Sequence, residues 1–302
     1  RLCPDGVEFK TLDSLVSYVQ PGPYIVSSTE YDAHYSTPVL TAGQSFILGY
    51  TNEEEGIYNA SSQKPVIIFD DFTTSFHWVD FDFKVKSSAL KILKIKDKQE
   101  ADFRYIYMAM KTIHFIPTNH MRHWISLYSK FEIPLPPLNI QKEIVSILDS
   151  FTSLIDKMKQ EVEMRKKQME YYREKLMAPQ TNWKIKTLGE IGTFTRGNGL
   201  QKSDFRVKGF PCVHYGQIHT YYNTCIYKTK SFCEEDLAKK LQKASYGDLL
   251  IATTSEDVKA CCKAAVWFGA GDVAYSGDSF CYSHDQDPKY MAYLFQTEMF
   301  AK

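Results

Sequence analysis

The stretch that decides the fold runs from residue 140 to residue 177 and reads IQKEIVSILDSFTSLIDKMKQEVEMRKKQMEYYREKLM. It contains neither proline nor glycine, and most of its residues favour helix. Apolar side chains recur every three or four positions, which places them on one face of a helix. The pattern predicts one continuous helix, about 57 Å long at about 1.5 Å per residue.

The opposite face of this helix is charged, with lysine, arginine and glutamate at most positions from 157 to 175. A helix of this length cannot bury its apolar stripe inside one compact domain, so we expect it to pair with another helix, as in a coiled coil. Prolines at 134, 136 and 137 precede it, and a proline at 179 ends it. We assign residues 138–179 to a long spacer and dimerisation helix. The predicted packing residues are Ile144, Leu148, Phe151, Leu154, Ile155, Met158, Val162, Met169, Tyr172 and Leu176.

The segments on the two sides of this helix resemble each other. Residues 7–12 (VEFKTL) correspond to residues 183–188 (WKIKTL), and a Thr-Thr-Ser triplet occurs at 73–75 and again at 253–255. An aromatic helix is expected to begin near residue 103 and again near residue 289. A repeat of this long period predicts two related domains, one before the long helix and one after it.

Each flanking segment mixes strands with short helices. β-Branched and aromatic content predicts strands at 45–49, 66–70, 76–85 and 90–95, with a helix at 101–110. Alternation in residues 81–86 (FDFKVK) predicts a half-buried strand with Lys84 and Lys86 on its solvent-facing side. In the second segment we expect strands at 211–215, 249–253, 264–268 and 280–282, and helices at 234–242 and 289–300. The predicted fold class is α+β, with two similar β-rich lobes, residues 1–137 and 180–302, joined by the long coiled-coil-forming helix.

The composition excludes several classes of protein. Lys+Arg and Asp+Glu both number 36, so the formal net charge is zero and any grip on nucleic acid must come from local patches. A hydrophobic fraction of 44% argues against a disordered chain. No run approaches the roughly 20 apolar residues that span a membrane, so no membrane partner is expected. Seven cysteines, an odd number without a Cys-x-x-Cys pair, do not indicate a disulfide framework or a zinc site.

Several segments, in order along nearly the whole chain, resemble the specificity (S) subunits of type I restriction–modification systems. They are residues 3–12 (CPDGVEFKTL), 133–138 (IPLPPL) and 165–176 (RKKQMEYYREKL). The second lobe adds 188–192 (LGEIG), 196–197 (RG) and 215–218 (YGQI). The resemblance implies that each lobe is a target-recognition domain that reads half of a bipartite sequence in double-stranded DNA.

The same resemblance implies the partners. In that family the long helices pair as a spacer and dock two methyltransferase (M) subunits, and restriction (R) subunits complete the nuclease. The S subunit catalyses nothing and holds no cofactor, whereas S-adenosylmethionine belongs to the M subunits and ATP and Mg²⁺ to the R subunits. A cytoplasmic location and a role in DNA methylation follow. Self-association through the exposed long helix is also expected.

The repeat carries one further expectation. The first lobe is followed by a proline-rich exit and a long helix, and the second lobe is not. By analogy with residues 111–177, we expect a truncation that removes about 65 residues and the second long helix.

DNA readout requires amides, hydroxyls and basic groups at base edges, with further donors on phosphates. Gln217 has the side chain to pair bidentately with adenine, and polar loops surround Thr73 and Thr253. Each candidate taken alone is also an ordinary turn or cap residue. Arg196-Gly197 fits a phosphate-binding loop and a tight turn about equally well, and the resemblance favours phosphate contact. The DNA-binding candidates are Thr41, Gln44, Ser45, Thr73, Thr74, Ser75, His77, Lys84, Lys86, Arg122, Arg196, Gly197, Lys202, Gln217, His219, Thr253, Thr254, Ser255, Tyr275 and Ser276.

Catalytic readings have less support. The chain has no glycine-rich cofactor loop with an Asn-Pro-Pro-Tyr motif, which a base methyltransferase would need. An acid…acid-x-Lys pattern, from Asp70 or Asp71 to residues 82–84, would suit a Mg²⁺ nuclease but is degenerate. The histidines near residue 120 lack metal-ligand spacing, so no catalytic or metal residue is expected. The alternative function is a non-DNA helical scaffold or adaptor with repeated lobes.

Overall fold

The computed structural model describes residues 3, 6–43, 45–117, 121–254 and 262–301. Contacts divide the chain into two units, Arg1–Met158 and Lys159–Lys302, and the helix α3 (Leu138–Met177) belongs partly to each. We call the part of the first unit before α3 the first lobe, and the part of the second unit after α3 the second lobe. Among the described residues, no helix is long and apolar enough to cross a membrane.

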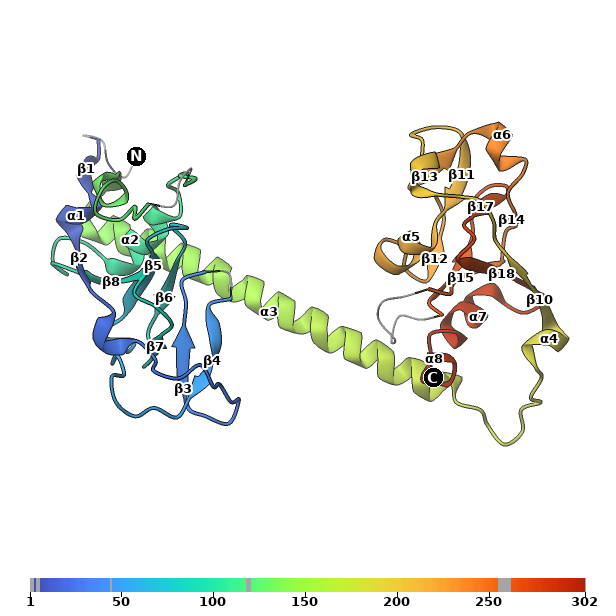
Figure 1. The fold of residues 1–302 in the computed structure, drawn as a ribbon, viewed down its shortest axis with the longest axis horizontal. Coiled ribbons are helices and arrows are strands. Elements are labelled where there is room, and N and C mark those ends of the chain that lie inside the picture. The colour runs from blue at the N-terminus through green and yellow to red at the C-terminus, as the bar shows by residue number, and fades with distance from the viewer. Residues whose placement is uncertain (1–2, 4–5, 44, 118–120, 255–261, 302) are drawn as a thin grey trace. The chain divides into compact units, whose positions relative to one another are not determined.

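The first lobe mixes strands with short helices, as Figure 1 shows. Its helical elements are α1 (Leu12–Leu15), α2 (Phe103–Met110) and the 3-10 turns η1 (Gly22–Tyr24) and η2 (Tyr128–Lys130). Its strands are β1 (Glu8–Thr11), β2 (Val16–Val19), β3 (Thr37–Leu40), β4 (Ile47–Thr51), β5 (Val66–Asp70), β6 (Phe76–Val79), β7 (Lys84–Val85), β8 (Leu90–Ile95) and β9 (Glu132–Leu135).

An antiparallel sheet in the order β2-β8-β5-β6 organises the core of this lobe. Alternate residues of a strand point to opposite faces. In β5, Ile67 and Phe69 pack in one cluster with α1 and α2, whereas Val66 and Ile68 pack in another with Val85 of β7. Both faces of β5 are covered, which agrees with the continuous apolar run of its first four residues, Val66–Phe69. A second sheet, β4-β3-β7, pairs β3 antiparallel with β4 and parallel with β7, and β1 pairs with β9.

The second lobe is built from similar elements. Its helical elements are α4 (Leu188–Ile191), η3 (Lys202–Asp204), α5 (Tyr215–Thr220), α6 (Glu235–Ala238), α7 (Pro288–Leu294) and α8 (Glu298–Ala301). Its strands are β10 (Gly192–Arg196), β11 (Phe210–Val213), β12 (Cys225–Ile226), β13 (Ser231–Cys233), β14 (Lys243–Ala244), β15 (Leu249–Ala252), β16 (Ala264–Trp267), β17 (Val273–Tyr275) and β18 (Ser279–His284).

The two lobes share one topology. The order β10-β18-β15-β16 repeats β2-β8-β5-β6, with β12 added at the end, and β13-β11-β17 repeats β4-β3-β7, with β14 added. In the small sheet of the first lobe β3 pairs parallel with β7, and in that of the second lobe β11 pairs parallel with β17. Asp102 accepts a hydrogen bond from the N–H of Tyr105 at the start of α2, and Asp287 accepts one from the N–H of Tyr290 at the start of α7. The expected α+β fold with two similar β-rich lobes and a long helix is confirmed.

Several predicted boundaries are wrong, with identifiable causes. The strand expected at 76–85 is two strands, because β6 pairs with β5 in one sheet and β7 pairs with β3 in the other. The strand expected at 211–215 ends at Val213, because α5 begins at Tyr215. The helix expected at 234–242 is shortened to α6, and the one expected at 289–300 is divided into α7 and α8.

Candidate functional site

The turn between β5 and β6, residues 71–75, presents polar groups at the end of a buried strand. The Asp70 carboxylate accepts hydrogen bonds from the N–H groups of Phe72 and Thr73, at 2.9 and 2.8 Å. The hydroxyls of Thr73 and Ser75 lie 2.5 Å apart. Thr74 has φ 58°, which is rare for a β-branched residue. Its side chain is buried and its hydroxyl donates to the Thr73 carbonyl, so Thr74 is not the exposed DNA contact that we expected.

Asp71 holds the base of this turn. One carboxylate oxygen accepts from the N–H of Trp124 at 3.0 Å, and the Asp71 carbonyl accepts from the N–H of His123 at 2.8 Å. The other carboxylate oxygen lies 3.1 Å from Nζ of Lys91, and both side chains are 1% exposed. Lys91 also donates to Gln20 at 3.2 Å. These contacts fix the turn to the rest of the lobe.

Among the described residues, no group of three His, Cys, Asp or Glu side chains could hold a metal ion.

His77 connects the β5–β6 hairpin to the turn between β3 and β4. Its Nε2 lies 2.9 Å from the carbonyl oxygen of Gly43, and its ring stacks on Phe46 with the centroids 4.6 Å apart. The hydroxyl of Thr41 accepts from the N–H of Gly43 at 3.3 Å. Ser45 is exposed in the same turn. Three of the first-lobe candidates, Thr41, Ser45 and His77, therefore lie in one neighbourhood.

A second cluster forms where β15 ends, around the turn at residues 277–278. Carbonyl groups of this turn accept from the N–H and the hydroxyl of Thr253, each at 3.1 Å, and from Nε of Arg196 at 3.2 Å. Nε2 of His219 lies 2.9 Å from the Thr254 carbonyl oxygen. Arg196, Thr253 and Thr254 are exposed. We call Arg196, His219, Thr253, Thr254 and this turn the second-lobe cluster.

Five further candidates fall into two groups. Lys86, Arg122 and Lys202 are exposed, and the Lys86 ammonium lies 5.8 Å from the ring centroid of Tyr31. Gln44 and Ser255 lie outside the described residues.

The prediction that Lys84 faces solvent is wrong. Lys84 is 3% exposed, its Nζ lies 2.8 Å from the Glu53 carboxylate, and it donates to the Glu55 carbonyl at 2.6 Å. A Cβ at Gly56 would come 3.2 Å from the same Nζ. The loop at residues 53–56 therefore covers the side of β7 that the alternating sequence pattern predicted to face solvent.

Tyr275 and Ser276 are also not exposed loop residues. Tyr275 belongs to β17, is fully buried, and donates from its hydroxyl to the Thr195 carbonyl at 3.0 Å. Ser276 is 1% exposed, and its hydroxyl oxygen accepts from the N–H of Tyr215 at 2.9 Å. Tyr275 joins the two sheets of the second lobe and Ser276 holds the start of α5, so we withdraw both as DNA contacts.

The side chain of Gln217 caps the start of α5. Its amide oxygen accepts from the N–H of His214 at 3.1 Å, and its amide nitrogen donates to the Ser231 hydroxyl at 2.7 Å. Burial lowers the pKa of His214, whose Nδ1 accepts from the N–H of Gly216 at 3.2 Å. Because both ends of the Gln217 amide already have protein partners, bidentate pairing with adenine would require these bonds to break. Sequence reasoning missed α5, because its N-cap is His214 rather than the Ser, Thr, Asp or Asn that marks a helix start.

Gly197 is required by packing between strands. Its N–H donates to the Ser279 carbonyl at 2.9 Å, and a Cβ at this position would lie 2.1 Å from the Ser276 carbonyl oxygen. The backbone donor that a phosphate-binding loop would offer is already used. The close approach of the Ser276 backbone accounts for the glycine, which is a different structural reason from the expected tight turn, and Arg196 remains an exposed cation beside it.

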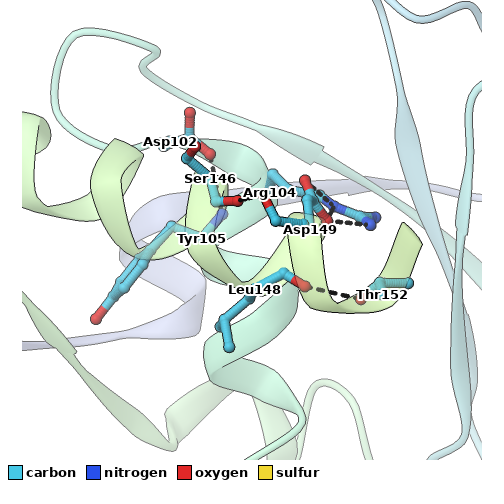
Figure 2. A network of polar contacts seen from close by, with 8 residues as sticks. Asp102, Arg104, Tyr105, Ser146, Leu148, Asp149 and Thr152 are labelled. Atoms are coloured by element: carbon cyan, nitrogen blue, oxygen red, sulfur yellow. Dashed lines mark hydrogen bonds and ion pairs between the residues drawn. The ribbon is translucent and has the colours of Figure 1, made fainter. Parts of the chain in front are cut away.

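The start of α3 is fastened to the first lobe by polar contacts that sequence reasoning did not identify. Figure 2 shows the Arg104 guanidinium of α2 facing the Asp149 carboxylate of α3, where Nη2 and Nε donate at 2.8 and 3.1 Å. Gln141 is fully buried; its amide oxygen accepts from the N–H of Asp102 at 2.8 Å, and its amide nitrogen donates to the Pro136 carbonyl at 2.8 Å. The apolar spacing of α3 predicts which apolar side chains pack, but it does not predict that the polar side chain of Gln141 is fully buried.

The predicted packing stripe of α3 is largely exposed. Ile144 packs against the core of the first lobe, so its predicted packing has a partner within the lobe. The remaining stripe residues are between 42% and 67% exposed. They are Leu148, Phe151, Leu154, Ile155, Met158, Val162, Met169, Tyr172 and Leu176.

Comparison with known proteins shows which proteins this chain is similar to. The chain is 47% identical over 213 residues to the type I restriction enzyme EcoR124I/EcoR124II specificity subunit of Escherichia coli, a match that covers 66% of this chain and 52% of that protein. The chain thus spans about half the length of this relative.

Two solved structures share the fold. A type I restriction-modification system S subunit from M. genitalium aligns with TM-score 0.55 and 17% identity, over 97% of this chain and 78% of that one. A chain from a structure of type I R-M complex assembly and conformational transition aligns with TM-score 0.58 and 12% identity, over 98% and 81%. A family model described as the type I restriction modification DNA specificity domain matches residues 4–164. The chain belongs to this family of type I restriction–modification specificity proteins.

Proposed function

We propose that this chain is the non-catalytic, sequence-specific DNA-recognition subunit of a type I restriction–modification complex. The observation that carries the proposal is the shared topology of the two lobes, each with a polar turn at the end of the same strand. Thr73 and Ser75 follow β5, and Thr253 and Thr254 follow the corresponding β15. Two related surfaces of this kind suit two half-sites of a bipartite target, because half-site spacing follows the spacing of the reading modules.

The proposed DNA contacts are the exposed or half-exposed members of the candidate set, apart from Gln217, whose amide is bonded within the lobe, and Gly197, whose N–H is bonded to Ser279. Hydroxyls and histidines suit base edges, and the basic residues suit phosphates. The contacts are Thr41, Ser45, Thr73, Ser75, His77, Lys86 and Arg122 in the first lobe, and Arg196, Lys202, His219, Thr253 and Thr254 in the second.

We further propose the domain boundaries and the partners. Residues 1–137 and 180–302 are the two recognition domains, and residues 138–179 are the spacer, which docks M subunits and pairs with a second helix through its exposed apolar stripe. The stripe also permits self-association. R subunits complete the assembly. S-adenosylmethionine is assigned to the M subunits, ATP and Mg²⁺ to the R subunits, no cofactor to this chain, and the complex to the cytoplasm.

Methylation specificity of the assembled complex tests the proposal. We expect T73A/S75A to relax the sequence requirement in one half-site and T253A/T254A to relax it in the other, as measured by methylome sequencing of cells that carry all subunits. T112A, whose hydroxyl donates to the Ala109 carbonyl at the end of α2, is the control and should leave the target unchanged.

The exposed stripe favours one alternative, a helical adaptor without DNA recognition. That function predicts capture of M subunits by the full chain and no DNA footprint from the complex. If both turn variants leave the methylated sequence and its occupancy unchanged, DNA reading by these turns is wrong.

A further inference from the structure

A cavity of about 510 Å³ lies in the first lobe, beside the beginning of α3. Its walls come from the segment before β5, from β6 and β8, and from the first turns of α2 and α3. The volume falls within the roughly 300–1,000 Å³ typical of small-molecule sites. None of the proposed DNA contacts of the first lobe is among the described residues that line it.

The lining is strongly cationic. Lys64, Lys94, Lys98, Arg104 and Lys142 contribute to it, against one carboxylate among the described lining residues, Asp102. That carboxylate is engaged in capping α2. Like charges gathered around one cavity repel one another, so the site favours a bound anion.

The contacts of these cations show how much charge is left. Arg104 is paired with Asp149. Lys98 donates to a carbonyl, that of Gln63, at 3.2 Å, which leaves its charge uncompensated. Lys64 and Lys142 are exposed and form no ion pair within the described residues. The positive end of the helix dipole adds to this field, because α3 begins at the cavity with no acidic residue in its first turn.

The cavity also has an apolar wall. Trp78 is half-buried and lies 5.4 Å from Phe103, centroid to centroid, and Val66 and Leu138 line the same space. A small inorganic anion would use only the lysines. A ligand with both a phosphate and a planar ring would use the cations and the wall together, which is how small-molecule sites obtain both affinity and orientation.

We propose that this cavity binds a phosphate-bearing ligand of nucleotide size, with its phosphate held by the lysines and its ring against the Trp78–Phe103 wall. Two sources share this chemistry: a free nucleotide, and a nucleotide unit of a DNA strand. The site is separate from the turns that we propose to read sequence.

Isothermal titration calorimetry of the full chain with ADP tests the site. We expect one ADP per chain, and an affinity reduced about tenfold or more in K64Q/K142Q because two charge-assisted contacts are lost. K111Q/K208Q removes the same net charge from exposed lysines outside the cavity and should bind ADP as the unmodified chain does. K94M/K98M provides a second pocket variant if the first does not fold. No ADP binding, or an equal loss in the K111Q/K208Q control, would overturn the proposal.

A competition arm distinguishes the two sources. If a short DNA duplex displaces ADP and K64Q/K142Q loses duplex affinity by the same factor, the phosphate belongs to DNA. If ADP still binds with unchanged affinity to the chain saturated with duplex, the ligand is a free nucleotide. Either result supports a phosphate site in this cavity, whereas ADP binding that is insensitive to both pocket variants contradicts it.

Discussion

The ammonium of Lys91 lies 3.1 Å from the carboxylate of Asp71, and both side chains are 1% exposed. This ion pair connects β8 to the β5–β6 turn that presents Thr73 and Ser75. A buried pair of this kind contributes little net stability compared with apolar side chains, but it is costly to break on one side only. Replacing only Asp71 or only Lys91 should therefore destabilise the turn more than replacing both residues together.

D71N should destabilise the first lobe by about 3–5 kcal/mol, because Lys91 would remain buried without a countercharge. The double variant D71N/K91M should recover part of that loss. Hydrogen exchange of peptides that cover residues 66–79 measures the local free energy of opening. Equal protection in D71N and the unmodified chain would show that the pair does not hold the turn.

The junction between the first lobe and α3 offers a comparison between two polar contacts. Q141A should cost about 1–3 kcal/mol, because it leaves the half-buried N–H of Asp102 and the buried carbonyl of Pro136 without these partners. R104M should cost only about 0–1 kcal/mol, since the Arg104–Asp149 pair is partly exposed. Hydrogen exchange at residues 138–150 in each variant checks this order, and a larger effect for R104M would reverse our view of what fastens the helix.

The sequence predicted the elements whose pattern is set by local spacing or by burial on both faces. The strands β5 and β8 were predicted with their observed ends, and the first four residues of each are buried. The long helix was predicted within two residues of its observed start.

Elements that depend on long-range pairing were not predictable in the same way. The strand β1 pairs with β9, more than 120 residues later in the chain, and its side chains are exposed or half-buried, so no alternation marks it. Lys84 was misplaced because alternation within its strand cannot reveal that Glu53, from a distant loop, covers it. The polar turns after β5 and β15 were found by their residue types, but the internal partners of Gln217 and Ser276 depend on tertiary contacts.

Gly197 gives a test that separates packing from phosphate binding. G197A should destabilise the second lobe by about 1–3 kcal/mol, because a Cβ would lie 2.1 Å from the Ser276 carbonyl oxygen. The matched control is G189A in α4, where a Cβ would meet nothing within 4 Å. Thermal unfolding followed by circular dichroism should show a lower midpoint for G197A alone. A normal midpoint combined with weaker DNA binding would instead favour the phosphate-loop reading.

The ion pair of the half-buried Glu53 with the buried Lys84 predicts a pH dependence of stability in the first lobe. The hydrogen bond from Lys84, and then those from the Ser28 and Ser27 backbone, hold the pKa of Glu53 below its ordinary value. A carboxyl group whose pKa is lowered by folding contributes stability at neutral pH. That contribution is lost as the pH falls below about 4.3, the usual value for glutamate, through the lowered pKa. E53Q should therefore be less stable than the unmodified chain at pH 7, and the difference should shrink as the pH falls.

Urea unfolding at several values from pH 7 to pH 3 measures this difference, with E161Q as the control. Glu161 pairs with Arg165 on the exposed surface of α3, where the two side chains are 62% and 69% exposed. Such a pair contributes about 0–1 kcal/mol, so E161Q should resemble the unmodified chain at every pH. A difference between E53Q and the unmodified chain that stays constant down to pH 3 would mean that the ionised Glu53 carboxylate contributes nothing. The loop at residues 53–56 would then be held over β7 by packing and by the bond from Lys84 to the Glu55 carbonyl alone.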